Sequence, residues 1–312
     1  MGEAAALLSA FVWSAVSVAM ASIAARVPPL AISTLRLATG SVLLFVFLAI
    51  SGQAGDIAAA PASAILAMLG SGLLAYALGD TIYIRSLGLL GVQRAFTVAQ
   101  SLFVTLTVLG GVLLLDEPFG IPQVIGTACI AVGIGLIVRR PAAKAAAGAA
   151  ASAPPVVHAN LLARLRHPES GELRGYLFIA VTGVFWTVAT LWLAAGRGDL
   201  GPIAAASMRT PAGAAGLLLF AGVTAPDALR MPFRDKRNIG AIVATGIVGT
   251  AFGSLMYVYA VGEAGAARTT ILSSVSPLMA LPLSVVFLGE RLTPRVVAGT
   301  LACVLGILFV VA

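Results

Sequence analysis

Three ionisable residues, Arg36, Asp80 and Arg209, lie inside long apolar stretches of this 312-residue sequence. Ionisable side chains are costly inside a bilayer, so they are functional candidates by default. Asp80 could take up and release a proton and thereby couple a process to protons, or it could form an interfacial ion pair near Arg85. Arg36 and Arg209 could attract an anionic group or hold a gate shut. Alternatively, both arginines reach toward the interface or tie their helices to the bundle.

Hydroxyl, amide and aromatic side chains share these apolar stretches and could line a substrate-binding cavity between helices. Each hydroxyl could instead bond to a carbonyl of its own helix, and each aromatic ring could anchor at the interface. The cavity candidates are Trp13, Ser17, Tyr76, Tyr83, Thr97, Gln100, Trp186, Thr190, Tyr257, Ser273 and Ser276.

Four further residues are gating or structural candidates at interruptions of the apolar runs. Pro277 and Pro282 interrupt one run, and proline removes an intrahelical hydrogen bond and kinks a helix. Carbonyls freed near Ser276 could face a cavity, or the kink could simply shape the bundle. Glu117 and Glu290 follow two other runs and are predicted to cap the helix that comes next.

The residue types give no pattern for a metal site, a cofactor or catalysis. Cys129 and Cys303 lie singly in apolar segments, and His158 and His167 lie in a polar stretch. No histidine lies inside a predicted span to act as a base, and no second carboxylate in a span accompanies Asp80. We therefore predict no metal, no cofactor and no catalytic residues, and we expect that the protein is not an enzyme.

The elements that carry these residues are predicted to be membrane-spanning helices. The chain is 60% hydrophobic and 10% charged, with a mean hydropathy of +1.04, whereas soluble domains have about 45–50% apolar and about 25% charged residues. This composition excludes a soluble or a disordered protein. Because a helix needs about 20 apolar residues to cross a bilayer, we predict an all-α integral membrane protein. The predicted spans are 4–25, 30–50, 62–84, 95–115, 122–138, 175–195, 203–223, 239–261, 269–288 and 295–312.

A polar segment separates these ten spans into two groups of five. Residues 139–174 are rich in Ala and Arg, contain Pro154-Pro155 and include both histidines. This composition is typical of a linker. The predicted organisation is therefore a first five-helix repeat over 1–138, a linker over 139–174 and a second five-helix repeat over 175–312.

The two halves also match each other residue by residue, which indicates an internal duplication. The matches occur in the same order in both halves, at a spacing of 173 or 174 residues. They pair Trp13 with Trp186, Arg36 with Arg209, Tyr83 with Tyr257, Gly91 with Gly265, Arg94 with Arg268, Glu117 with Glu290, Gly126 with Gly299 and Gly133 with Gly306. Asp80 falls on Ser254 and is not repeated. Because each repeat has an odd number of spans, the second must enter the membrane from the opposite side. Such inverted-topology repeats are typical of secondary transporters.

The distribution of positive charge tests this topology independently. Fifteen of the 19 Lys and Arg residues fall on one side of the predicted spans, whereas Arg197 and Arg268 fall on the other. The positive-inside rule then places the linker in the cytoplasm and both termini outside. The net charge of the chain is +7, and its Lys and Arg residues lie between the apolar runs. They form no basic patch interleaved with aromatic residues, so we predict no nucleic-acid partner.

These features resemble the drug/metabolite transporter (DMT) superfamily, specifically proteins with two EamA-type domains. The resemblance covers nearly all of the chain apart from the linker. It rests on the Trp in the first span of each half, the Arg early in the second, and the ending of the fourth. That ending is Phe287-Leu288-Gly289-Glu290-Arg291-Leu292 in the second half and the degraded Leu114-Leu115-Asp116-Glu117-Pro118 in the first. The resemblance implies ten helices around a central cavity lined mainly by helices 1, 3, 4, 6, 8 and 9. The charge count places both termini outside, whereas most two-domain members have both termini in the cytoplasm.

The expected function is secondary active transport of a small metabolite by alternating access across a bacterial-type cytoplasmic (inner) membrane. An amino acid or a similar zwitterion, moved outward, fits the hydroxyls, aromatics and single acid of the predicted cavity. The alternatives are a uniporter or a drug exporter of the same fold, and, less favoured, a membrane enzyme, a channel or a sensor subunit. The sequence contains no Walker motif, so nothing in it indicates transport driven by ATP. The expected partners are a small-molecule substrate, protons and the lipid bilayer, with the monomer as the functional unit.

Overall fold

The computed structural model describes residues 1–312 except 25, 116–119, 139–168, 274, 290–292 and 312. The described residues form helices and no strands. The first half contains α1 (Gly2–Ala24), α2 (Pro29–Ser51), α3 (Ala54–Ala59), α4 (Ala62–Gly72), η1 (Leu73–Gly79), α5 (Asp80–Leu90), α6 (Val92–Leu115) and α7 (Ile121–Val138). The second half contains α10 (Glu169–Gly196), α11 (Pro202–Thr224), α12 (Pro226–Arg230), η2 (Met231–Arg234), α13 (Lys236–Thr245), η3 (Gly246–Gly253), α14 (Ser254–Ala264), α15 (Ala266–Ser273), α16 (Ser276–Leu288) and α17 (Pro294–Val311).

Eight stretches of the described helices are long and apolar enough to cross a membrane, and Pro294–Gly306 is a shorter apolar helix. The eight are Gly2–Ala24, Pro29–Ser51, Ala62–Leu90, Val92–Leu115, Gly171–Gly196, Pro202–Thr224, Lys236–Ala264 and Ala266–Leu288. Each overlaps a predicted span, which confirms the all-helical, multi-pass fold. Several of these helices are longer than the predicted spans. The prediction follows the apolar run, whereas the helix continues into the polar residues beyond the end of that run.

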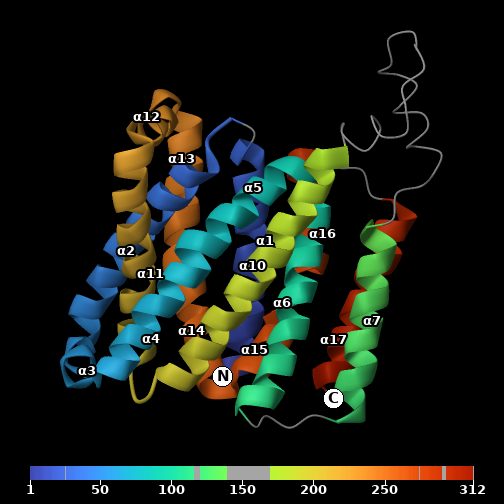
Figure 1. The fold of residues 1–312 in the computed structure, drawn as a ribbon, viewed down its shortest axis with the longest axis horizontal. Helices are drawn as coiled ribbons and strands as arrows, with labels where there is room; N and C mark the ends of the chain where they lie inside the picture. The colour runs from blue at the N-terminus through green and yellow to red at the C-terminus, as the bar shows by residue number, and fades with distance from the viewer. Residues whose placement is uncertain (25, 116–119, 139–168, 274, 290–292, 312) are drawn as a thin grey trace.

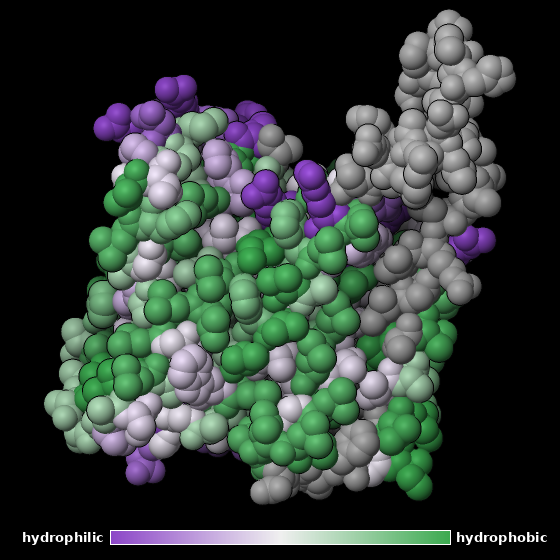
Figure 2. Space-filling model, in the orientation of Figure 1, coloured by the Kyte–Doolittle hydropathy of each residue, from purple (hydrophilic) through white to green (hydrophobic). Residues whose placement is uncertain are grey.

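The outer surface of the bundle matches a lipid environment. Phe45, Ile50, Leu113, Phe220 and Phe287 are large apolar side chains that are all at least half exposed. Figure 2 shows hydrophobic residues across the middle of the molecule and hydrophilic residues gathered at the end where α12 lies. An apolar surface of this extent is not typical of a soluble monomer, whereas lipid chains would cover it.

Two spans contain a widened, π-helical segment that the sequence pattern did not predict. η1 separates α4 from α5, and η3 separates α13 from α14. A π-helical segment shifts the faces of the helix that follows and is frequent at functional sites. Asp80 is the first residue after η1, and Ser254 is the first residue after η3. The widened segments therefore set the direction of these two matched positions.

Glycines bring helix backbones from the two halves into direct contact beside these segments. A Cβ atom at Gly72 would collide with the carbonyl group of Arg209, and one at Gly246 would lie 2.8 Å from the carbonyl oxygen of Arg36. Small residues allow such close approach between membrane helices. The contact between α4 and α11 thus has a counterpart between η3 and α2. Gly72 and Gly246 are 174 residues apart, as Asp80 and Ser254 are, and the carbonyl groups that they approach belong to the matched Arg209 and Arg36.

The pair formed by α7 and α17 stands at one edge of the bundle, where the two helices lie side by side (Figure 1). A Cβ at Gly133 would lie 2.5 Å from the carbonyl oxygen of Gly299, and one at Gly306 would lie 2.5 Å from that of Gly126. In the first contact a glycine of α7 meets α17, and in the second the matched glycine of α17 meets α7. This reciprocity is expected for two helices related by a two-fold axis.

Two sharp turns join neighbouring spans at opposite ends of the bundle. Gly91 turns the chain from α5 into α6 with φ 74°, and Gly265 turns it from α14 into α15 with φ 83°. Glycine adopts positive φ values at little cost. The first turn lies at the α12 end of the bundle, and the second lies near the amino terminus (Figure 1).

Candidate functional site

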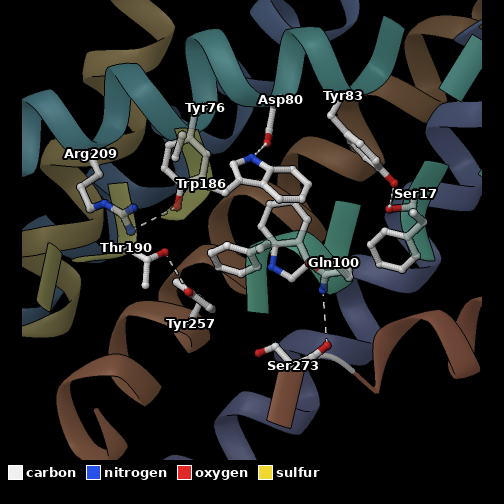
Figure 3. A pocket seen from close by; sticks show the side chains of 14 residues that line it. Ser17, Tyr76, Asp80, Tyr83, Gln100, Trp186, Thr190, Arg209, Tyr257 and Ser273 are labelled. Carbon is white, nitrogen blue, oxygen red and sulfur yellow. Dashed lines mark hydrogen bonds between the residues drawn. The ribbon is translucent and has the colours of Figure 1, made fainter. Parts of the chain in front are cut away.

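A cavity lies where helices of both halves meet near the middle of the bundle (Figure 3). Its volume is about 70 Å³, and a water molecule needs at least roughly 10–15 Å³ of such space. The cavity therefore has room for several water molecules or a small ligand. It is lined by Trp13, Ser17, Ala75, Tyr76, Asp80, Tyr83, Phe96, Gln100, Phe103, Trp186, Thr190, Arg209, Tyr257 and Ser273.

The structure brings the predicted substrate-binding candidates together around this cavity, except Thr97 and Ser276. Thr97 is buried in α6, and the Ser276 hydroxyl donates to the carbonyl oxygen of Ser273 in the preceding helix. Sequence reasoning missed the apolar lining residues Ala75, Phe96 and Phe103. In a uniformly apolar chain, an apolar residue that faces a cavity looks no different from one that faces lipid.

A buried ion pair between Arg36 and Asp80 stands at one side of the cavity. The Trp186 indole Nε1–H donates to the Asp80 carboxylate over 3.0 Å, and the Arg36 guanidinium lies 6.0 Å from the centre of the Trp13 ring. A Cβ at Gly79 would lie 2.9 Å from the Trp186 indole, so glycine at this position lets the indole approach. The carboxylate is thus held by one residue of each half.

This pairing corrects two expectations for the charged residues. Asp80 does not pair with Arg85, whose guanidinium lies 5.3 Å from the centre of the Phe178 ring. The span continues to Leu90, so Asp80 lies deeper in the bundle than its distance from the end of the apolar run indicated. Arg36 and Arg209 do not reach an interface, because their exposed fractions are 0% and 1%.

Arg209 lies at the other end of the cavity in a different environment (Figure 3). Its Nε–H donates to the Ser71 hydroxyl over 2.8 Å, and Nη1 donates to the Tyr76 hydroxyl over 3.5 Å. The Tyr76 hydroxyl lies 2.5 Å from the Ser254 hydroxyl. Among the described residues, no carboxylate forms an ion pair with Arg209. Its partners there are neutral hydroxyls and the Tyr76 ring.

Aromatic rings form the wall between these two charged ends. The Trp186 ring centre lies 5.2 Å from that of Tyr83 and 5.9 Å from that of Phe103, and Phe96 lies 6.2 Å from Tyr83. These separations are typical of favourable aromatic pairs. The Tyr83 hydroxyl donates to the Ser17 hydroxyl over 3.1 Å. The wall is therefore apolar and packed, with its polar groups directed to defined partners.

The opposite wall carries buried hydroxyl, amide and backbone carbonyl groups. Thr190 and Tyr257 share a hydrogen bond of 3.0 Å between their hydroxyls. The Gln100 side-chain amide donates to the Ser273 carbonyl oxygen over 3.4 Å, and no described residue forms a hydrogen bond with the buried Ser273 hydroxyl. This wall can offer both donors and acceptors to a small ligand.

The predicted proline interruption lies beside this wall. Pro277 is in the first turn of α16, and Pro282 lies inside that helix. The Ser14 hydroxyl of α1 donates to the Ser276 carbonyl oxygen over 2.7 Å. This carbonyl is therefore satisfied by a neighbouring helix, which favours the interpretation that the interruption shapes the bundle. The roles of both prolines in gating stay predictions.

Glu117 and Glu290 lie outside the described residues, so their predicted capping roles stay predictions. Within the described part of the chain, no three His, Cys, Asp or Glu residues cluster in a way that could hold a metal ion.

Comparisons with known proteins agree with this architecture. Residues 1–139 and 173–312 match the EamA-like transporter family. A stretch of 86 residues is 37% identical to an uncharacterized transporter of Archaeoglobus fulgidus, and it covers 28% of this chain and 31% of that relative. The chain thus matches about a third of the relative's length.

A crystal structure of another protein superimposes with a TM-score of 0.70 at 18% identity, over 99% of this chain and 96% of the other. At this identity the likeness concerns the fold alone. The family match, in contrast, covers both halves of the chain and leaves out only residues 140–172. The chain therefore belongs to the EamA-like transporter family.

Proposed function

We propose that this membrane transporter is a secondary active transporter that moves a small metabolite by alternating access. The observation that carries the proposal is the central cavity, which both halves line with aromatic, hydroxyl and ionisable side chains. Its volume of about 70 Å³ favours a small substrate over a large drug. An amino acid or a similar zwitterion fits the mixture of charged, hydroxyl and apolar groups, and export is the proposed direction.

The proposed architecture is ten membrane-spanning helices in two inverted repeats, over 1–138 and 175–312, joined by the linker 139–174. The matched contacts of Gly72 and Gly246, and of Gly133 and Gly306, support a two-fold relation between the halves. The matched turns at Gly91 and Gly265 lie at opposite ends of the bundle, as an inverted repeat requires (Figure 1). Two similar halves around one cavity can open to either side at similar energy.

Matched surface ion pairs add support for this arrangement. Arg94 in the first turn of α6 pairs with Glu172 of α10 over 2.9 Å, and Arg268 in the first turn of α15 pairs with Glu3 of α1 over 2.8 Å. Each pair joins the two halves, one at each end of the bundle. We propose that alternating access opens one of these contacts while the other stays closed.

The proposed location is a bacterial-type inner membrane with the linker in the cytoplasm and both termini outside. The concentration of Arg and Lys near α12, at the end of the bundle away from both termini, supports this orientation under the positive-inside rule. We propose that the monomer is the functional unit, because both repeats lie within one chain. Neither a cofactor nor a nucleic-acid partner is part of the proposal.

Asp80 is the proposed proton-coupling residue. It is the carboxylate that lines the cavity, and it lies between Arg36 and Trp186 of opposite halves. Protonation would remove its charge and weaken both contacts. Because the contact with Trp186 joins the halves, the protonation state would change the relative stability of the two access states.

Counterflow in liposomes tests the proposal. Purified protein is reconstituted, and uptake of labelled amino acids is measured with and without a pH gradient. We expect exchange of at least one amino acid, accumulation driven by the gradient in the wild type, and exchange without gradient-driven accumulation in Asp80→Asn. Asp56→Asn, on the short helix α3, is the control and should retain coupling.

The other outcomes separate the alternatives. Exchange that never responds to the gradient favours a uniporter. Absence of exchange across the panel in a monodisperse preparation rejects amino acids as the substrate class and moves the search to sugars, nucleotides and cationic drugs.

A further inference from the structure

The two matched arginines of the bundle differ in their countercharge. Arg36 has Asp80, whereas the sequence comparison places Ser254 where a carboxylate would face Arg209. Ser254 instead shares a hydrogen bond with the Tyr76 hydroxyl, which in turn accepts from Arg209. The surroundings of Arg209 thus keep the cation, and the hydroxyl groups of Ser254 from the second half and Tyr76 from the first stand in place of the acid.

Arg209 therefore contributes a positive charge to the cavity that no described carboxylate balances. Its exposed fraction is 1%, and it is one of the lining residues. Asp80, the acid among those lining residues, is already engaged by Arg36. Burying a guanidinium without a countercharge is expensive, and an anion that enters beside it recovers much of that cost.

We propose that Arg209 is the carboxylate-binding residue of the cavity, so that a substrate must carry a carboxylate group. This proposal rests on the transport function proposed above and names the group by which that site recognises its substrate. Ser71 fixes the guanidinium Nε, and Tyr76 holds Nη1 and stacks at 5.2 Å from the guanidinium carbon. The side chain is thus held in one orientation beside the cavity, and a guanidinium in fixed geometry suits a carboxylate.

The same charge distribution determines what the site rejects. A cationic ligand would approach Arg209 without a free acid to bind, because the Asp80 carboxylate oxygens already accept from Arg36 and Trp186. Carboxylates and zwitterions should therefore enter, and amines that lack a carboxylate should not. An amino group on a zwitterion would face the hydroxyls of Thr190 and Tyr257 on the opposite wall.

Binding of charge-matched ligands tests the proposal. Quenching of tryptophan fluorescence reports binding, because Trp13 and Trp186 line the cavity. The probes are acetate, butanoate and 4-methylpentanoate, the primary amines with the same numbers of carbon atoms, and leucine. In the purified wild-type protein we expect saturable binding of a carboxylate of the series and no saturable binding of its matched amine.

The decisive variants change the charge at the matched position while leaving Arg209 in place. Ser254→Asp places a carboxylate near Arg209, with the Tyr76 hydroxyl between them. Ser254→Asn introduces an uncharged side chain of the same size as Asp. We expect Ser254→Asp to raise the Kd for carboxylates at least about tenfold, the change expected when one charge-assisted hydrogen bond is lost. Ser254→Asn should bind carboxylates with a Kd within about threefold of that of the wild type. Arg209→Lys should retain part of the binding, and Arg209→Gln should lose it.

The proposal is overturned if no carboxylate of the series binds, if the amines bind as tightly, or if Ser254→Asp and Ser254→Asn behave alike. Counterflow measured in parallel separates this proposal from the transport function. Carboxylate binding without exchange supports the site and contradicts transport, whereas exchange of amines without carboxylate binding supports transport and contradicts the role of Arg209.

Discussion

The buried pair of Arg36 and Asp80 gives a quantitative prediction of stability. Removing one partner of a buried ion pair costs about 3–5 kcal/mol, because the other charge stays buried without compensation. No described residue relieves that cost at Arg36, because none of them forms a hydrogen bond with its buried Nε and Nη1 atoms. Since 1 kcal/mol shifts Tm by about 2–4 °C in proteins of 150–250 residues, we expect Asp80→Asn and Arg36→Met each to lower the apparent Tm by about 10 °C.

The double variant Arg36→Met/Asp80→Asn separates the pair from the packing of its side chains. Replacing both charges of a buried pair is often nearly neutral, so the double variant should melt within a few degrees of the wild type. Thermal unfolding of the purified protein in detergent, followed by tryptophan fluorescence at one fixed scan rate, measures the three values. Unchanged single variants, or a double variant whose loss equals the sum of the single losses, would refute the reasoning.

An exposed ion pair supplies the matched control. Asp227 and Arg230 lie 3.6 Å apart with side chains 94% and 81% exposed. Because solvent screens such a pair, Asp227→Asn should leave Tm unchanged in the same assay.

Two further predictions concern how the helices pack and begin. Gly72→Ala should lower the apparent Tm by several degrees, because the added Cβ meets the backbone of α11, whereas Gly222→Ala on the same α11 meets open space and should leave Tm unchanged or raise it slightly. Gln53→Ala should destabilise by about 1 kcal/mol, because its side-chain oxygen accepts from two backbone N–H groups at the start of α11; Gln53→Glu keeps that acceptor and should melt close to the wild type. Equal melting of the two glycine variants, or of the two Gln53 variants, would contradict these contacts.

Sequence reasoning predicted those features that depend on composition and spacing. Long apolar runs predicted helices that are long enough to cross a membrane, and the structure confirms this class of fold. Hydroxyl, amide and aromatic residues within the apolar runs were the cavity candidates, and the structure gathers most of them around one cavity. These signals are visible in the sequence because polar residues are rare in an apolar chain.

The sequence did not predict which charged residues meet. Arg85 lies five positions from Asp80 in the sequence, but Arg36 on a separate helix is the partner. The π-helical segment before Asp80 helps to explain the difference, because it alters the face on which the following residues lie. Such a segment leaves no clear mark in hydrophobic periodicity, so tertiary packing had to be seen to identify the pair.

The most direct test of the central claim is whether the cavity is the transport pathway. Trp186 lines the cavity, whereas Trp192 on the same helix is 43% exposed and is not among the lining residues. Counterflow of a substrate identified in liposomes should therefore fall at least about tenfold in Trp186→Ala, which loses the hydrogen bond to Asp80 and two aromatic contacts. It should stay within about twofold of the wild type in Trp192→Ala, at equal amounts of folded protein. Equal rates for the two variants would contradict transport through this cavity.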